Sequence, residues 1–356
     1  MRVFLFSVAF LVVYDVVAGR LFAFPGPSDG PPNALQVYFD YGRSVEGKIR
    51  RMVPPPPEQA ERVANAGFIN WELEQTKSVD PATEIRVTAY GQSFTRHIGR
   101  ILRKAPDVSI RVVAGPGAPL NHSFTCYAED PRATEANVAM LGILASSLPT
   151  MHSMTDMTRS FERPWPYCYP RYFLEGGELR THELGIRSLG AFQEALHDTE
   201  RWTAIKRELA DDDAYFSTAL FGLQALDRST VCRLIRRGLG QGRSRRVRQG
   251  YLDENGYRDD KGLVSEARAI VREFGRLARE RQQLPVALLF NNRGYADYLV
   301  KALGPTLERE GIPYCSTHEV ASASDASLFR PDGHFIPEID EKFAAVVLET
   351  LRERMH

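Results

Sequence analysis

The stretch that decides the fold is EIRVTAYGQSFTRHIGRIL, residues 84–102. Its first seven residues are rich in β-branched and aromatic side chains, which favour a strand. Apolar residues then recur with the spacing of one helical face, at Phe94, Ile98, Ile101 and Leu102. The stretch therefore predicts a strand followed directly by a helix, which is the repeating unit of α/β proteins.

The same alternation continues on both sides of a long interruption. Four more strands are predicted, at residues 108–115, 137–147, 285–292 and 312–318, and further helices at 263–277, 295–310 and 338–353. The third strand, NVAMLGILASS, is apolar almost throughout, as expected for a strand covered on both faces. We therefore predict an α/β fold with a five-stranded, parallel, doubly wound sheet between two helical layers.

Residues of about 150–260 do not follow this alternation and are predicted to form a helical or irregular insertion. Its stretch FERPWPYCYPRYFL, residues 161–174, is dense in aromatic rings, which line a carbohydrate or acyl groove or simply pack an irregular loop. A later stretch carries seven arginines and no acid between Arg233 and Arg248. This stretch could bind an anionic polymer or lipid headgroups, and the alternative is a solvated, mobile loop.

The N-terminal residues 1–24 are predicted to be a signal peptide or membrane anchor, because an unbroken apolar run extends from Val3 to Tyr14. The lack of a clear cleavage site favours the anchor, and a buried first helix is the alternative. Either targeting segment would export the rest of the chain, although basic residues after it oppose that orientation. Residues 25–83 are predicted to be a proline-rich tether with a short accessory segment.

Composition excludes several classes of function. The 356 residues include 45 basic and 45 acidic side chains, so no net charge favours binding to nucleic acid. An exported chain would also not encounter nucleic acid. Four cysteines, Cys126, Cys168, Cys232 and Cys315, show no CxxC spacing, and they form up to two disulfides or remain buried thiols. No metal site is predicted, because no ligand spacing such as HExxH occurs, and no cofactor is implied.

Candidate catalytic residues lie at the two ends of the α/β region. Ser93 follows the first strand and begins a helix, where a nucleophile or a helix-capping serine is expected. Asp332 and His334, in PDGHF, follow the fifth strand and precede the last helix. A serine hydroxyl needs an imidazole to take its proton, and the imidazole needs a carboxylate beside it. The sequence therefore favours a triad of Ser93, His334 and Asp332.

These residues resemble the SGNH (GDSL-like) hydrolase superfamily. Gly91-Gln92-Ser93 matches its Gly-Asp-Ser block, PDGHF matches its last block, and the resemblance covers about residues 84–148 and 263–354. It implies a flavodoxin-like, SGNH-type domain over 84–354. The Gly-x-Ser-x-Gly elbow of α/β-hydrolases is absent, since Thr95 stands at the second glycine.

Three positions depart from that pattern. Gln92 replaces the usual aspartate, and the last block reads Asp-x-His as in alginate-type acetylation proteins, with Asp325 as a second candidate acid. Ser146 and Ser147 stand where the asparagine and aspartate of the Gly-x-Asn-Asp block are expected.

The oxyanion hole implied by the resemblance combines the Ser93 amide, a glycine amide after the second strand and an asparagine side chain. We assign the glycine to Gly117 ahead of Gly115, and the side chain to Asn121. Other candidate donors are Ser146, Asn291 and Asn292, whereas Asn121 and His122 could equally belong to a turn or helix cap.

The resemblance implies a serine esterase or O-acyltransferase acting on O-acetyl or other small acyl esters of a cell-surface or secreted polysaccharide. It places the domain in the periplasm, anchored to the inner membrane or released after signal cleavage, beside exopolysaccharide biosynthesis proteins. The alternatives are a lipolytic or thioester hydrolase that uses the aromatic insertion, and a catalytically weak polysaccharide-binding or assembly protein.

Overall fold

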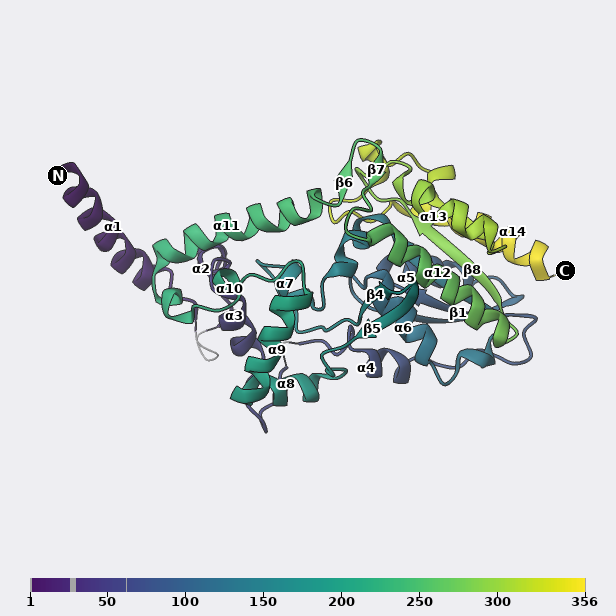
Figure 1. Ribbon diagram of the computed structural model, residues 1–356, viewed down its shortest axis with the longest axis horizontal. Helices are drawn as coiled ribbons and strands as arrows, with labels where there is room; N and C mark the ends of the chain where they lie inside the picture. The colour runs from purple at the N-terminus through teal and green to yellow at the C-terminus, as the bar shows by residue number, and fades with distance from the viewer. Residues whose placement is uncertain (1, 26–29, 62, 356) are drawn as a thin grey trace. The chain divides into compact units, whose positions relative to one another are not determined.

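The central sheet of the computed structural model has five strands, and every neighbouring pair is parallel (Figure 1). The strands are β1 (Ile85–Gly91), β2 (Val108–Ala114), β3 (Val138–Leu144), β8 (Leu284–Phe290) and β9 (Tyr314–Ser316). They lie in the order β2-β1-β3-β8-β9. The predicted five-stranded parallel α/β sheet is confirmed, with each strand at its predicted place in the chain.

Helices cover both faces of this sheet. On one face, α5 (Ser93–Leu102) and α14 (Pro337–Met355) share a buried core with strand side chains that include Val87 and Ala89. On the other, the Tyr127 ring of α6 (Leu120–Glu129) lies 5.2 Å from the ring of Tyr90. Since neighbouring strand residues point to opposite faces, these helices form two layers. Two further helices, α12 (Leu263–Glu280) and α13 (Tyr298–Arg309), pack on the α6 side, with α12 against both α6 and α13.

The strand order places a topological switch point between β1 and β3. The chain runs from β1 outward to β2 and then returns past β1 to β3. In open α/β sheets, ligands bind beside the carboxyl ends of the strands at such a point. Ser93 lies there, two residues beyond the end of β1.

Close packing brings the start of α5 against the ends of β1 and β3. A Cβ atom at Gly91 would lie 2.1 Å from Thr95 Oγ1, and one at Gly142 would lie 1.9 Å from the same atom. Because real Cβ atoms do not approach other atoms so closely, both strands need glycine where α5 begins. This packing fixes the position of the helix that carries Ser93.

A buried ion pair joins β2 to the end of α6. The Arg111 guanidinium makes a two-pronged contact with Asp130, and Tyr90 Oη donates a hydrogen bond to Asp130 Oδ2 at 2.5 Å. The Arg111 and Asp130 side chains are no more than 1% exposed. Burial and the adjacent Asp130 carboxylate raise the pKa of Tyr90, so the phenol remains a donor. This network links three elements of the sheet region.

We expect Asp130→Ala to lower the free energy of unfolding by about 3–5 kcal/mol, because it leaves the buried Arg111 cation without its partner. Tyr90→Phe removes one hydrogen bond and should cost about 1 kcal/mol. Chemical denaturation followed by circular dichroism compares the two variants. Equal stability of Asp130→Ala and Tyr90→Phe would contradict a buried ion pair.

The structure describes residues 2–25, 30–61 and 63–355, and the chain divides into two units. The helical unit comprises residues 1–63, 153–168 and 190–247, and the sheet unit comprises 64–152, 169–189 and 248–356. Segments from the predicted anchor, tether and insertion therefore gather in the helical unit. Residues 26–29 and 62 of the predicted tether, and Met1 of the predicted anchor, lie outside the described residues.

The smaller elements have the following bounds. In the helical unit they are α2 (Ala34–Asp40), α3 (Val45–Met52), α7 (Asp156–Arg159), α8 (Leu189–His197), α9 (Thr199–Asp212), α10 (Thr218–Phe221) and η3 (Gln224–Arg228). In the sheet unit they are α4 (Ile69–Glu74), η1 (Ala133–Glu135), η2 (Ala145–His152), the hairpin β4 (Arg171–Glu175) and β5 (Glu178–His182), the hairpin β6 (Leu252–Asp253) and β7 (Gly256–Tyr257), η4 (Thr317–Glu319) and η5 (Ala326–Leu328).

The N-terminal segment forms one helix, α1 (Arg2–Leu21), which is long and apolar enough to cross a membrane (Figure 1). A signal sequence would have the same length and composition. Asp15, which interrupts the apolar run, accepts a hydrogen bond from the Val231 amide at 2.8 Å. The segment expected to be an anchor or signal is thus helical, and Asp15 joins it to residue Val231 of the same helical unit.

The arginine-rich stretch is also helical. It belongs to α11 (Thr230–Gln249), and the Arg236 guanidinium is buried against Asp227. The Asp227 carboxylate also accepts from Ser44 Oγ at 2.6 Å, so this arginine has a packing role in the helical unit. The prediction of a loop is therefore wrong for this stretch, although Arg245, Arg246 and Arg248 are exposed to solvent.

The aromatic stretch 161–174 is largely packed. Four of its rings are no more than 9% exposed, namely Phe161, Tyr167, Tyr169 and Tyr172, whereas Trp165 is 39% exposed and stacks on Tyr167. All four cysteines are free thiols, so neither of the two disulfides considered above forms.

Candidate active site

Ser93 and His334 come together although 241 positions separate them in the chain. Ser93 Oγ lies 2.7 Å from His334 Nε2. Ser93 is the first residue of α5, and His334 lies in the loop before α14. Because both helices pack on the same face of the sheet, their starting points lie near each other at the switch point. The hydroxyl and the imidazole are therefore within proton-transfer distance.

A tight turn displays His334. The Gly333 amide donates to the Arg330 carbonyl at 2.9 Å, and the Arg330 amide donates to the His334 carbonyl at 2.7 Å. Gly333 has a φ of 86°, which favours glycine. The His334 ring stacks on Phe94 with centroids 4.8 Å apart and planes at 28°. Packing as well as hydrogen bonding therefore orients the imidazole.

Asp332 lies beside the second nitrogen of the same imidazole. Asp332 Oδ2 is 3.2 Å from His334 Nδ1, but the two are not aligned for a hydrogen bond. The His334 backbone amide donates to Asp332 Oδ1 at 3.1 Å and lowers the pKa of this carboxyl, which is therefore ionised at neutral pH. Since the Asp332 side chain is 63% exposed, its attraction for an imidazolium is screened by water.

The alternative acid, Asp325, has a different local role. Its carboxylate accepts from the Ser327 amide at 2.9 Å and from Ser327 Oγ at 2.7 Å, and so it caps η5. Among the described residues, the carboxylate paired with His334 is that of Asp332.

A second histidine lies next to the Ser93–His334 pair. The rings of His97 and His334 have centroids 4.9 Å apart, and His97 Nδ1 is 3.2 Å from Asp340 Oδ2. Burial raises the pKa of Asp340, and His97 opposes that shift. The sequence prediction missed both residues, although His97 follows Ser93 by four positions and so shares its helical face.

Gln92 supports the turn that carries Ser93. Its side chain is buried, and α5 has no side-chain cap, so Ser93 is not a capping residue. In the amide orientation that satisfies both ends, Gln92 Nε2 donates to the Gly142 carbonyl at 3.2 Å, and Oε1 accepts from the Leu144 amide at 3.3 Å. The glutamine that replaces the expected aspartate thus joins the turn to β3.

The predicted oxyanion donors have different surroundings. The Gly115 amide donates to the Gly91 carbonyl at 3.2 Å and extends the pairing of β1 with β2. Gly117 has a φ of 61° in the loop between β2 and α6. The Asn121 side chain is fully buried in α6, and its Nδ2 donates to the Pro170 carbonyl. The Gly115 and Asn121 donors are therefore used elsewhere, and Gly117 stays the predicted glycine donor of the loop.

Three other candidate donors lie at strand ends. Asn292 Nδ2 donates to Ser146 Oγ at 2.8 Å, and the Ser146 amide donates to Asn292 Oδ1 at 3.0 Å. Asn291 Nδ2 donates to Ser316 Oγ at 3.2 Å. Ser147 Oγ, at the other departure from the family block, donates to the Leu144 carbonyl at 2.8 Å. These contacts join β3, β8 and β9.

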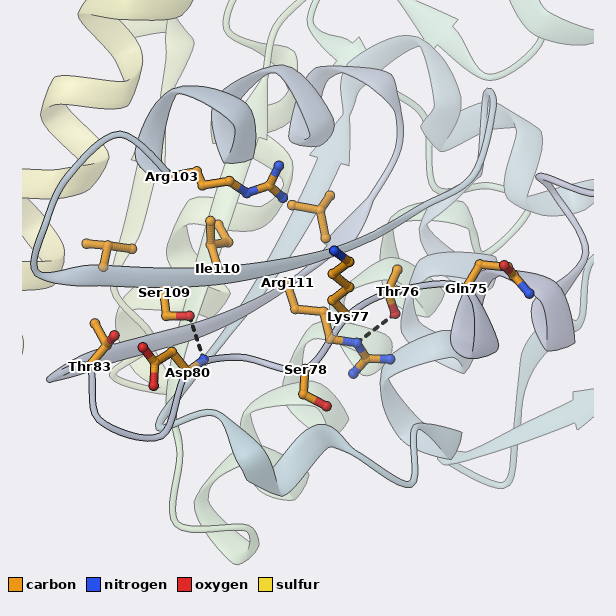
Figure 2. A pocket seen from close by; sticks show the side chains of 12 residues that line it. Gln75, Thr76, Lys77, Ser78, Asp80, Thr83, Arg103, Ser109, Ile110 and Arg111 are labelled. Carbon is orange, nitrogen blue, oxygen red and sulfur yellow. Dashed lines mark hydrogen bonds between the residues drawn. The ribbon is translucent and has the colours of Figure 1, made fainter.

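A hollow of about 660 Å³ at the outer edge of β2 contains none of the predicted site residues. Figure 2 shows Asp80 and Thr76 beside Ser109 and Arg111 of β2. The Asp80 amide donates to Ser109 Oγ, and Arg111 Nε donates to Thr76 Oγ1, both at 2.7 Å. These contacts hold segment 76–80 against the open edge of the sheet.

The fold and the site define an α/β protein with a parallel sheet and a serine–histidine pair at its switch point. Comparison with family models, curated proteins and solved structures finds no match to this chain.

Proposed function

We propose that this protein is a serine esterase or O-acyltransferase of the SGNH type. The observation that carries the proposal is the 2.7 Å contact between Ser93 Oγ and His334 Nε2 at the switch point. A buried or half-buried serine commonly bonds to nearby backbone, whereas this hydroxyl meets an imidazole from the far end of the chain. Such a pair is the arrangement that nucleophilic acyl transfer needs.

The reaction would proceed through an acyl-enzyme. His334 Nε2 takes the hydroxyl proton as Ser93 Oγ attacks the ester carbonyl, and it then gives the proton to the departing alcohol. Water or a sugar hydroxyl next attacks the acyl carbonyl and loses its proton to His334. The acyl–Oγ bond then breaks, the acid or new ester leaves, and His334 returns the proton to Ser93 Oγ. Asp332 favours the imidazolium that forms in each step, and contact with Phe94 holds the ring.

Backbone amides would stabilise the oxyanion. The first amides of a helix have no partner within that helix, and Ser93 is the first residue of α5. The Gly117 amide is the second proposed donor. Because Asn121 and Asn292 already donate to other groups, the site has no assigned asparagine donor, and we expect modest turnover.

The proposed substrates are O-acetyl esters of a cell-surface or secreted polysaccharide. Small acyl groups are favoured because most rings of the 161–174 stretch are packed and do not line an acyl groove. With α1 as a membrane anchor, the sheet unit would face the periplasm, beside exopolysaccharide biosynthesis proteins.

Acetate release from an O-acetylated polysaccharide tests this proposal. The full chain in detergent should release acetate, or transfer it to an unacetylated glycan. Ser93→Ala should do neither. Faster hydrolysis of long-chain acyl esters than of acetyl esters would favour a lipolytic enzyme. Glycan binding without hydrolysis or transfer would overturn the enzymatic proposal in favour of a binding protein.

A further inference from the structure

A buried cluster of metal-ligand side chains lies in the sheet unit, apart from the triad. It consists of Glu72 on α4 and of His122 and Cys126 on α6, and one potential ligand atom from each lies within 4.8 Å of the other two. His122 and Cys126 are four positions apart, so they share one helical face. All three residues are no more than 3% exposed.

Two of the three separations between donor atoms match the spacing around a tetrahedral zinc ion, and the third, between His122 and Cys126, is within 4.8 Å. His122 Nε2 lies 3.2 Å from Glu72 Oε2, and Cys126 Sγ lies 3.6 Å from the same oxygen. Zinc bonds of about 2.0–2.3 Å, arranged tetrahedrally, separate neighbouring ligand atoms by about 3.3–3.6 Å. The side chains thus already converge as ligands would.

In the part of the chain that the structure describes, the cluster has polar atoms without hydrogen-bond partners, and no arginine or lysine balances its carboxylate. Glu72 Oε1 and His122 Nδ1 are buried and have no hydrogen-bond partner among the described residues. Within the described residues, the ion-pair partner of Glu72 is His122, and no arginine or lysine forms an ion pair with it. Buried carboxylates are normally paired with a cation or bound to a metal. A divalent ion would supply the missing positive charge.

We propose that Glu72, His122 and Cys126 bind a zinc ion. The ion would replace the thiol proton of Cys126, which leaves to solvent, and its two positive charges would balance the carboxylate and the thiolate. Three protein ligands leave one coordination position for water. The mixture of thiolate, imidazole and carboxylate favours zinc over magnesium or calcium, which prefer oxygen ligands.

The site would tie α4 and α6 to the end of β2. A Cβ atom at Gly115 would lie 2.3 Å from Glu72 Oε1, so this carboxylate lies against the loop that leads to Gly117. If the proposed esterase function holds, zinc would also steady one oxyanion donor. Metal binding itself does not depend on that function.

The test is cobalt and zinc binding to the untagged full chain in detergent. We expect about one ion per chain, and the cobalt form should show a thiolate-to-cobalt charge-transfer band with the visible bands of a tetrahedral ion. Cys126→Ser should abolish the charge-transfer band, and Glu72→Gln should weaken binding at least about tenfold. Cys315→Ser is the matched control, because Cys315 is equally buried but bonds to Thr350.

Two results would overturn the proposal. One is folded wild-type protein that takes up no stoichiometric metal, either during expression with added zinc or on refolding with cobalt. The other is a charge-transfer band that persists in Cys126→Ser. If that variant does not fold, X-ray absorption of the wild-type zinc form decides, with one sulfur at about 2.3 Å expected. None of these measurements uses esterase activity, so they remain informative if the proposed function fails.

Discussion

Ser93→Ala is expected to lower kcat for p-nitrophenyl acetate by about 10³-fold or more, with KM little changed. The reason is that the proposed pathway forms a bond to Ser93 Oγ, and no other hydroxyl is held 2.7 Å from His334 Nε2 among the described residues. Steady-state kinetics on the full chain, with burst amplitudes for the acyl-enzyme, measure the loss.

Ser109→Ala is a suitable control for this variant. Ser109 is also half-buried, on the edge strand β2, and its hydroxyl accepts a hydrogen bond from the Asp80 amide. This variant should keep kcat within about threefold. The lost hydrogen bond should lower the free energy of unfolding by about 1 kcal/mol, but it makes no contact with the transition state of ester hydrolysis. Equal activity of Ser93→Ala and the wild type would contradict the proposed mechanism.

His334→Ala should also lower kcat by about 10³-fold or more, whereas Asp332→Ala should lower it only about tenfold. Removing the imidazole removes the proton acceptor. Removing Asp332 deletes a contact to a 63% exposed carboxylate, whose attraction water screens, while Phe94 still holds the ring. The ratio of the two kcat values measures how much of the triad acts through its acid.

Asp340→Asn provides the matched comparison for Asp332. Asp340 is buried and contacts His97, whose ring lies beside His334. If Asp340→Asn lowers kcat more than Asp332→Ala does, the pair of Asp340 and His97 contributes more to the orientation of the His334 imidazole than Asp332 does. Full activity of His334→Ala would contradict the proposed proton transfer from Ser93 to His334.

Much of the sheet could be predicted because its strands carry local signals. β3 is buried at every position, as its apolar run indicates, and the amphipathic stripes of α5 and α12 match their packed faces. Ser93 and His334 could be paired from sequence because each flanks a predicted element whose end lies at the same edge of a parallel sheet.

Other features depend on distant contacts that leave no local pattern. α6 was not predicted because polar residues such as Asn121 and Thr125 are buried within it, and it begins after Pro119 with no side-chain cap. Glu72 is separated by 50 positions from His122, so no ligand spacing shows their convergence. The helical unit likewise joins segments whose pairing, such as Ser44 with Asp227, spans 183 positions.

The most direct test of the central claim is covalent labelling of Ser93 by a fluorophosphonate probe. The probe traps serines that an adjacent imidazole activates, and peptide mass spectrometry locates the adduct. We predict a single adduct on Ser93 in the wild-type chain and none in His334→Ala. A folded wild-type chain that gains no adduct at Ser93 would contradict the proposed nucleophile.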